Sequence, residues 1–317
     1  MLGVALTLIS TLAFSLNSVI SRRGLAVATA SAGAFITVLM GAPLFFVAAL
    51  ATGQLFNAGQ VSPNGYVLLS AAGVLHFGIG RYFNYRAAAA IGATRAQTVQ
   101  ALAIPYAILI AWLFLDEDVT LIMGFAIGLI LVGPSIMIQR GAKQAAPATV
   151  PSGGSTETDH TAPEMPAFQL RQVEGYLSAI ATIGAYGTSP ILIRAALRDT
   201  DDVSIFGGFV AYVAASAVLL LTLVHPLRRD LISALHPATV RLFLSAGFFV
   251  FLAQMFRFMA LAVADVAVVT PLMRTSAIFT LILSWMINRE LEVINLRMVA
   301  GMGFSVAGAV ILALNST

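Results

Sequence analysis

Three arginines stand inside long apolar stretches of the chain, where a charged side chain is costly. Arg81, Arg257 and Arg274 each fall within a run of mostly apolar residues that is long enough to cross a bilayer. An ionisable group at the bilayer centre costs about 2.5–3.5 kcal/mol, so it indicates a functional site. A guanidinium group binds a carboxylate or phosphate through two parallel hydrogen bonds. These arginines therefore predict an anion site; the alternative is that they bind carbonyls at helix ends or extend toward an interface.

Further polar residues occur at helical spacing: Asn84 and Gln254 lie one turn from Arg81 and Arg257, and Gln97 and Gln100 share a face of the fourth apolar segment. A tyrosine of the sixth apolar segment joins this set, because it belongs to a polar stripe along that segment. The serines and threonines of such stripes more often hold helices together than bind ligands. The predicted substrate-binding residues are Arg81, Asn84, Gln97, Gln100, Tyr186, Gln254, Arg257 and Arg274.

His76 is the one side chain within a predicted span that titrates near neutral pH. It is either a proton relay or, as we favour, a hydrogen-bonded structural histidine. Every carboxylate falls in a predicted loop, turn or linker. Small four-helix exporters that couple cations to protons depend on a glutamate in their first helix, where this chain has Asn17. We therefore disfavour cation export coupled through a carboxylate.

The composition is that of an integral membrane protein. Of the 317 residues, 59% are hydrophobic and only 10% are charged, whereas soluble domains carry about 25% charged residues. The absence of cysteine excludes disulfides, thiolate catalysis and cysteine metal sites. The four histidines are too far apart for a metal motif. We expect no cofactor, no metal, no nucleic-acid partner and no enzymatic activity.

Ten apolar segments have roughly the length that a bilayer core requires. Between the fifth and the sixth lies a segment rich in Pro, Ser, Thr and Gly, which we expect to be disordered. It separates a first repeat (1–140) and a second repeat (174–317) by a linker (141–173). The predicted spans are 2–21, 31–53, 65–89, 92–115, 119–138, 175–196, 203–224, 239–263, 265–288 and 293–314.

The second half repeats the first at a spacing of 173 residues. The two tryptophans of the chain, Trp112 and Trp285, correspond at this spacing, as do Glu117 and Glu290. Five crossings in each repeat force the second copy to lie upside down relative to the first. Inverted repeats are typical of secondary transporters, whose site lies near the midplane between the halves. The predicted fold is all-α, with ten transmembrane helices in two inverted five-helix repeats.

Lysine and arginine gather on the side of the predicted linker, for example at Arg86, Arg140 and Arg228. The opposite side carries essentially Arg198, beside several aspartates. The positive-inside rule therefore predicts a cytoplasmic linker and both termini outside, in the cell (inner) membrane.

Each repeat closes with a short acidic turn, Leu115-Asp116-Glu117 and Asn288-Arg289-Glu290, before a last helix that carries glycine. Together with Gly80-Arg81, these features resemble EamA-type members of the drug/metabolite transporter superfamily over nearly the whole chain except the linker. The resemblance implies a ten-helix exporter or permease for small metabolites. Its central cavity would be lined mainly by the first, third, fourth, sixth, eighth and ninth helices.

The chain departs from that family in two places. Pro105 and Pro271 lack counterparts in the opposite repeat, which predicts that the halves kink differently. The loop 54–65 lacks the basic residues that many members carry after the second helix.

Glu117 and Glu290 are predicted to cap the helices that follow them. The spacing of Gly124 and Gly128 predicts close helix packing.

The expected function is secondary transport of a small anionic or zwitterionic metabolite by alternating access. Alternatives are export of neutral or cationic compounds and, less favoured, a non-transporting membrane protein. An enzyme acting on lipids would need a carboxylate pair, a histidine-rich metal cluster or a nucleophile–base pair within the spans. Expected partners are the small-molecule substrate, membrane lipid and possibly a second copy of the chain in a homodimer.

Overall fold

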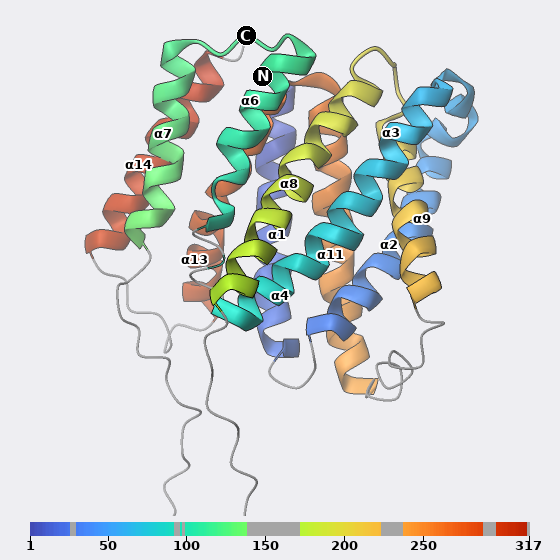
Figure 1. The fold of residues 1–317 in the computed structure, drawn as a ribbon, viewed down its shortest axis with the longest axis horizontal. Helices are drawn as coiled ribbons and strands as arrows, with labels where there is room; N and C mark the ends of the chain where they lie inside the picture. Colours follow the sequence, from blue (N-terminus) through green and yellow to red (C-terminus); the bar gives the residue numbers. More distant parts are fainter. Residues whose placement is uncertain are drawn as a thin grey trace, which may run out of the picture.

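The structure, a computed structural model, describes residues 1–25, 30–91, 96, 99–137, 172–222, 237–287 and 296–315. All regular elements in these ranges are helical, which confirms the predicted all-helical fold for this part of the chain (Figure 1). The first half contains α1 (Leu2–Leu25), α2 (Ala30–Ala51), η1 (Gln54–Gln60), α3 (Pro63–Gly73), η2 (Val74–Gly80), α4 (Arg81–Ile91), α6 (Ala103–Leu115) and α7 (Leu121–Met137). The second half contains α8 (Gln172–Leu197), α9 (Ser204–Thr222), α11 (Pro237–Val263), α12 (Val266–Leu272), η4 (Met273–Thr275), α13 (Ser276–Ile287) and α14 (Leu296–Leu314).

Several of these helices are suited to a membrane by length and composition. Gln172–Leu197, Ser204–Leu221 and Phe243–Val263 are each long and apolar enough to cross a membrane. A fourth span results if Phe35–Ala51 and Gln54–Gln60, which meet at an angle of 91°, count as one. Shorter apolar helices occur at Leu2–Asn17, Ala103–Leu115, Leu121–Val132, Val266–Thr280 and Ala300–Leu314. The number of ten spans therefore stays a prediction.

Three of the predicted spans are interrupted. The third consists of α3 and α4 joined by the π-helix η2, and the ninth of α12 and α13 joined by the 3₁₀ turn η4. In the fourth, a turn at residues 101–102 precedes α6. Pro105 lies in the first turn of α6, where its missing N–H costs little.

The breaks in the fourth and ninth segments correspond between the halves. Residues 101–102 match 274–275 at the spacing of 173 residues that relates the repeats. Because Pro105 and Pro271 do not correspond at this spacing, the sequence predicts kinks that differ. The structure instead interrupts both halves at equivalent positions, which indicates that the break belongs to the shared architecture and not to either proline.

The two halves pack mainly against each other. The most extensive helix contacts join α1 with α11, and α7 with α14. Figure 1 shows α7 and α14 side by side, and α1 begins at the same end of the molecule at which α14 ends. The end of α7 and the start of α8 lie at the opposite end. This arrangement matches the inverted orientation predicted for the second repeat.

The contact between α2 and α9 is reciprocal. At a spacing of 167 residues, Gly41 and Phe45 correspond to Gly208 and Tyr212. A Cβ atom on Gly41 would lie 2.1 Å from Cε1 of Tyr212, and one on Gly208 would lie 2.2 Å from Cε1 of Phe45. Each half therefore supplies a glycine notch and an aromatic ring that fills the notch of the other. Phe45 and Tyr212 are both fully buried, with ring centroids 5.0 Å apart.

The prediction of close packing at Gly124 and Gly128 is wrong. A Cβ atom on either residue would meet no atom within 4 Å. The close approach between α7 and α14 occurs instead at Gly308, where a Cβ would lie 2.6 Å from the carbonyl oxygen of Ala126. The glycine spacing that promotes packing does not say which helix face meets a neighbour, and here these two glycines face away from one.

Gly208→Ala should destabilise the fold, because the new methyl group would overlap the Phe45 ring. We expect the free energy of unfolding in detergent to fall by about 1–3 kcal/mol, as for an overpacked core. Gly124→Ala is the matched control, since its methyl group would meet open space and alanine favours helix by about 1 kcal/mol. Equal stability of the two variants would contradict the reciprocal packing, and Phe45→Leu should restore part of the loss in the Gly208→Ala background.

Candidate functional site

An irregular helical segment shapes the first part of the site. The π-helix η2 carries His76 and ends directly before Arg81. Such segments are rare and often occur at functional sites. Gly80, the last residue of η2, leaves room for Tyr186 of α8, whose Cε1 would lie 2.5 Å from a Cβ at that position. The Tyr186 ring consequently reaches the His76 ring, at a centroid distance of 4.7 Å.

Arg81 and Arg257, one from each half, interact with the same two side chains. The structure places both guanidinium groups within electrostatic range of His76 and of Tyr212. Tyr186 is a further electrostatic neighbour of Arg257. The predicted residues Arg81, Arg257 and Tyr186 are thus brought together, and we call these three with His76 and Tyr212 the arginine cluster.

Each arginine of the cluster is held by specific contacts. Arg81 donates from Nη1 to Oγ1 of Thr37 over 3.0 Å, and its Cζ lies 5.8 Å from the centroid of the Phe77 ring. Arg257 is only 5% exposed and donates from Nη1 to Oε1 of Gln254 over 3.2 Å. Gln254, itself buried, therefore orients Arg257 and does not stand as an independent ligand group.

The two arginines have related positions in the repeats. At the spacing of 173 residues, Arg81 corresponds to Gln254 and Asn84 corresponds to Arg257. Each half thus carries one arginine and one amide side chain, three residues apart, in opposite order. Asn84 lies half-buried on α4, one turn after Arg81. The same two helix positions therefore carry polar side chains in both halves.

Two buried polar atoms of the arginine cluster lack a hydrogen-bond partner among the residues that the structure describes. They are Nδ1 of His76 and the hydroxyl oxygen of Tyr212. A buried polar group without a partner costs about 1–3 kcal/mol, so such groups are rare outside functional sites.

Arg274 and Gln100 form a separate pair at the helix breaks. Arg274 lies on η4, and its Nη2 donates to the backbone oxygen of Gln100 over 3.5 Å. Nε2 of Gln100 is buried and has no partner in the described ranges. The sequence left two roles open for Arg274, binding an anion or binding a carbonyl at a helix end. This contact corresponds to the second role. Gln97, the remaining predicted site residue, lies outside the described residues.

Sequence reasoning did not find Tyr212, and it favoured a structural role for His76. Tyr212 sits in an apolar stretch of α9, where its hydroxyl gives no periodic signal. One feature of the sequence could have identified it. Gly41 and Phe45 recur as Gly208 and Tyr212 at a spacing of 167 residues, so an aromatic ring is kept at this position and the second copy adds a hydroxyl group. The orphaned Nδ1 does not fit a histidine that is held by hydrogen bonds on both sides.

The predicted polar stripes on α1 and α8 serve mainly the fold. The hydroxyls of Thr7, Thr11 and Thr182 donate to carbonyl oxygens of their own helices. Ser10 and Ser15 of α1 instead reach the second half, donating to the carbonyls of Ala253 and Ser276 over 2.7 and 2.9 Å. These contacts join helices, as expected of small hydroxyl side chains in apolar surroundings.

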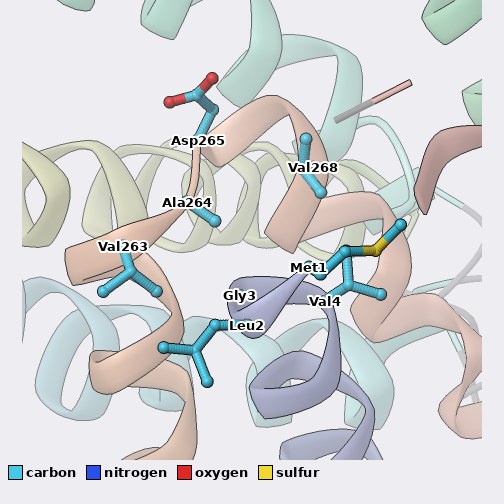
Figure 2. A pocket seen from close by; sticks show the side chains of 8 residues that line it. All are labelled: Met1, Leu2, Gly3, Val4, Val263, Ala264, Asp265 and Val268. Atoms are coloured by element: carbon cyan, nitrogen blue, oxygen red, sulfur yellow. The ribbon is translucent and has the colours of Figure 1, made fainter. Parts of the chain in front are cut away.

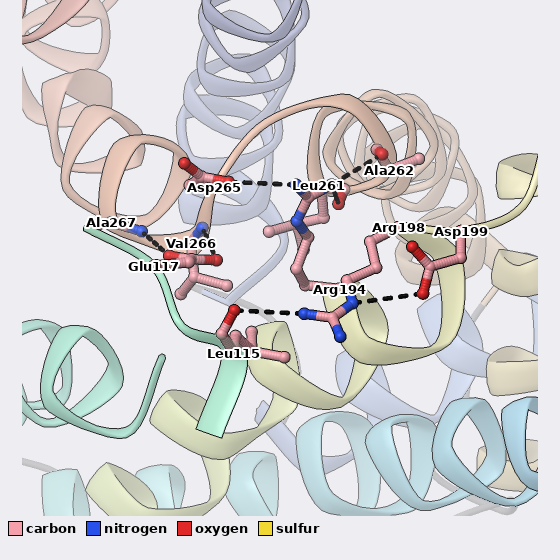
Figure 3. Close-up of polar contacts among 10 residues, drawn as sticks. All are labelled: Leu115, Glu117, Arg194, Arg198, Asp199, Leu261, Ala262, Asp265, Val266 and Ala267. Atoms are coloured by element: carbon pink, nitrogen blue, oxygen red, sulfur yellow. Dashed lines mark hydrogen bonds and ion pairs between the residues drawn. The ribbon is translucent and has the colours of Figure 1, made fainter. Parts of the chain in front are cut away.

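Hydrogen bonds tie the halves together at the end of the molecule where α1 begins. Both carboxylate oxygens of Glu117 accept from α12, over 2.9 Å from the N–H of Val266 and 3.0 Å from that of Ala267 (Figure 3). Glu117 was predicted to cap the helix that follows it, and this is wrong, because Thr120 caps α7 through the N–H of Met123. The carboxylate caps a helix of the opposite half; Glu290 lies outside the described residues.

Two further side chains bridge the halves at this end. Oε1 of Gln54 accepts from the N–H of Ile205 over 2.7 Å, and Nε2 donates to Oδ1 of Asp202 over 3.1 Å. Arg198 donates from Nη1 to the carbonyl of Leu115 over 3.2 Å (Figure 3). We call the hydrogen bonds of Glu117, Gln54 and Arg198 the end contacts.

The charges around the end contacts are largely balanced. Arg194 of α8 donates to the carbonyl of Ala262 over 2.8 Å and pairs with Asp265 over 3.1 Å (Figure 3). Burial raises the pKa of the Glu117 carboxyl, and the N–H groups of Val266 and Ala267 partly oppose that shift. The capping hydrogen bonds therefore offset much of the cost of enclosing this carboxylate.

A cavity of about 220 Å³ lies beside these contacts, between the start of α1 and the junction of α11 and α12 (Figure 2). Its one ionisable side chain is Asp265, which already pairs with Arg194. None of the predicted substrate-binding residues lines it. The cavity therefore does not account for the arginine cluster.

Comparisons with known proteins agree with this architecture. A sequence model of the EamA-like transporter family matches residues 1–139 and 173–314. One solved crystal structure of a protein superposes with a TM-score of 0.71, covering 99% of this chain and 97% of that chain at 17% sequence identity. That likeness shows a shared fold. None of the curated proteins matches the chain in sequence.

Glu117→Ala should destabilise the protein, because it leaves two fully buried N–H groups of α12 without acceptors. Loss of a helix cap costs about 0.5–2 kcal/mol, and an unsatisfied buried donor about 1–3 kcal/mol. We expect the free energy of unfolding in detergent to fall by about 2 kcal/mol or more. Asp118→Ala, an exposed neighbour, is the control; the same stability for both variants would refute the cross-half cap.

Proposed function

Because the chain belongs to the EamA-like transporter family, we propose that it moves a small anionic or zwitterionic metabolite across a membrane by alternating access. Membership makes it a multi-pass membrane transporter of the drug/metabolite superfamily, a family of transporters and not of enzymes. The substrate charge and the mechanism are our proposal, and they follow from the arginine cluster and from the contacts between the halves.

The observation that carries the substrate charge is the pair Arg81 and Arg257. Both guanidinium groups are within electrostatic range of His76 and Tyr212, whose orphaned polar atoms belong to the same cluster. The described carboxylates lie at helix ends or in turns, and their ion pairs are with Arg86, Arg194 and Arg198. A carboxylate or phosphate of the substrate would accept hydrogen bonds from both guanidinium groups.

The interlocked halves support alternating access. Substrate sites in inverted-repeat transporters lie between the repeats, which rock against each other. At the end where α1 begins, the halves are joined by the end contacts of Glu117, Gln54 and Arg198. At the opposite end, Nε of Arg86 binds Oε1 of Glu174 over 2.7 Å, also between the halves, but with both side chains partly exposed. Breaking one set while keeping the other would open the cluster to one side at a time.

We further propose that the chain crosses the cell (inner) membrane ten times, in two repeats (1–140 and 174–317) that are joined by a linker at 141–173. Outward apolar side chains such as Trp112 and Phe114, which are 56% and 73% exposed, suit contact with lipid or with a second copy of the chain.

The alternative is a transporter of neutral or cationic compounds. It is favoured by the contacts that already hold the arginines, namely Thr37 and Phe77 at Arg81, and Gln254 at Arg257. In that case the guanidinium groups stabilise the helix assembly, and the polar lining of the site comes from Gln100 and Tyr186.

Uptake into proteoliposomes of radiolabelled amino acids, organic acids and sugar phosphates tests the substrate charge. Arg81→Gln and Arg257→Gln should each lower uptake of one anionic class about tenfold or more, since hydrogen bonds to charged groups contribute about 1.5–3 kcal/mol. Arg274→Gln should have a smaller effect, because that side chain already binds the Gln100 carbonyl.

Arg241→Gln is the matched control, because Arg241 is an exposed arginine of the same helix as Arg257. Insertion and thermal stability of every variant are measured in parallel. Undiminished anion uptake by correctly folded Arg81→Gln and Arg257→Gln proteins would refute the anion site and favour neutral or cationic substrates.

A further inference from the structure

His76 occupies an unusual position for a titratable side chain. It lies on η2 and stacks between Phe77 and Tyr186, with ring centroids at 4.8 and 4.7 Å. Its Nδ1 atom is buried and has no partner in the part of the chain that the structure describes. The other three histidines, His160, His225 and His236, lie outside that part. His76 is therefore the histidine that the described helices bring to the boundary between the halves.

The groups that face His76 come from every element around it. The helices that pack against η2 are α3, α4, α8 and α9. Arg81 of α4 and Arg257 of α11 are within electrostatic range of His76, and the Tyr186 ring of α8 contacts it. Tyr212 of α9 contacts the ring of the adjacent Phe77, and Tyr66 of α3 donates its hydroxyl to the carbonyl of Ala58. On α4 and α8, Arg86 donates to the Tyr82 hydroxyl and pairs with Glu174, and Arg194 pairs with Asp265.

These neighbours couple the charge of His76 to the binding of an anion in the arginine cluster. Two guanidinium groups oppose a third positive charge beside them, and the opposition is strong where water is excluded. An anion bound to Arg81 and Arg257 reverses the local field and offers an acceptor to an imidazolium N–H. Protonation and anion binding therefore favour each other, and by linkage each increases the equilibrium constant of the other by the same factor.

We infer that His76 is the proton-coupling site of the transporter, so that one proton and one anion cross the membrane together. This inference rests on the proposed anion transport. The proton passes from water on the side of uptake to the imidazole as the anion binds. It returns to water on the opposite side when the anion leaves, and His76 is then neutral again.

The coupling gives transport a definite dependence on pH. Because an anion bound to Arg81 and Arg257 favours the protonated imidazole, protonation of His76 accompanies anion binding. Anion uptake should therefore increase as the pH on the side of uptake falls. With one proton per anion, a singly charged substrate should accumulate about tenfold per pH unit of gradient when the membrane potential is held at zero.

The experiment uses proteoliposomes of the full chain with a pH indicator trapped inside and the potential clamped by potassium and valinomycin. L-Glutamate, succinate and glucose 6-phosphate are the probes, because each stays charged between about pH 6 and 8 and does not cross lipid unaided. In the wild type, an inward proton gradient should raise accumulation of the transported probe about tenfold per pH unit, and internal acidification should accompany its uptake.

His76→Gln separates the possible results. We expect this variant to lower anion uptake, because it removes a hydrogen-bond donor of the site, and the uptake that remains should show neither the gradient response nor the acidification. The triple variant His160→Gln, His225→Gln, His236→Gln should behave like the wild type. A gradient response that survives in His76→Gln, or is missing from the wild type, overturns the coupling at His76 while anion transport stands. If the wild type moves none of the anions of the wider panel, the proposed function itself fails.

Should His76→Gln fail to insert, the wild type still decides the question. Proton and anion fluxes measured in the same vesicles give their ratio directly. A ratio near one with anion uptake that increases as the pH falls supports the inference, and anion flux without proton flux overturns it.

Discussion

The close approach of α2 and α9 is the contact on which both the fold and the candidate site depend. Gly41 accepts the Tyr212 ring, and Gly208 accepts the Phe45 ring, across the boundary between the halves. This exchange sets how near the two repeats come. It also places Tyr212 within electrostatic range of Arg81 and Arg257, so the side chain that packs between the helices is also a polar member of the arginine cluster. Each of the two repeats supplies one glycine and one aromatic ring to this contact.

The same exchange between halves recurs at the helix ends. Glu117 caps α12 and Gln54 caps α9, although each belongs to the first half and each capped helix to the second. A capping residue normally lies next to its helix in sequence. Here the caps hold only while the halves stay together at that end, so the stability of the assembly and its opening are governed by the same few hydrogen bonds.

The arginine cluster has an uneven charge distribution that suits a transporter. Thr37 and Gln254 orient the two guanidinium groups through hydrogen bonds. The described ion pairs that the arginines Arg86, Arg194 and Arg198 form lie at the ends of helices. The proposed anion site combines the two guanidinium groups with the neighbouring imidazole, whose charge can change as an anion binds.

The sequence alone determined the membrane class, the helical fold, the duplication with inversion and the arginines as candidate site residues, because composition, period and spacing are local properties of the chain. Only the tertiary structure decided which partner each residue meets. Arg81 and Arg257 are both within electrostatic range of His76. Arg274 instead donates to the backbone oxygen of Gln100. Glu117 accepts a hydrogen bond from Val266, which is 149 residues away in the sequence. Such contacts depend on how closely two helices approach, and this is decided by the steric fit of residues such as Gly41 and Tyr212. That fit produces no periodic pattern in the sequence of either helix.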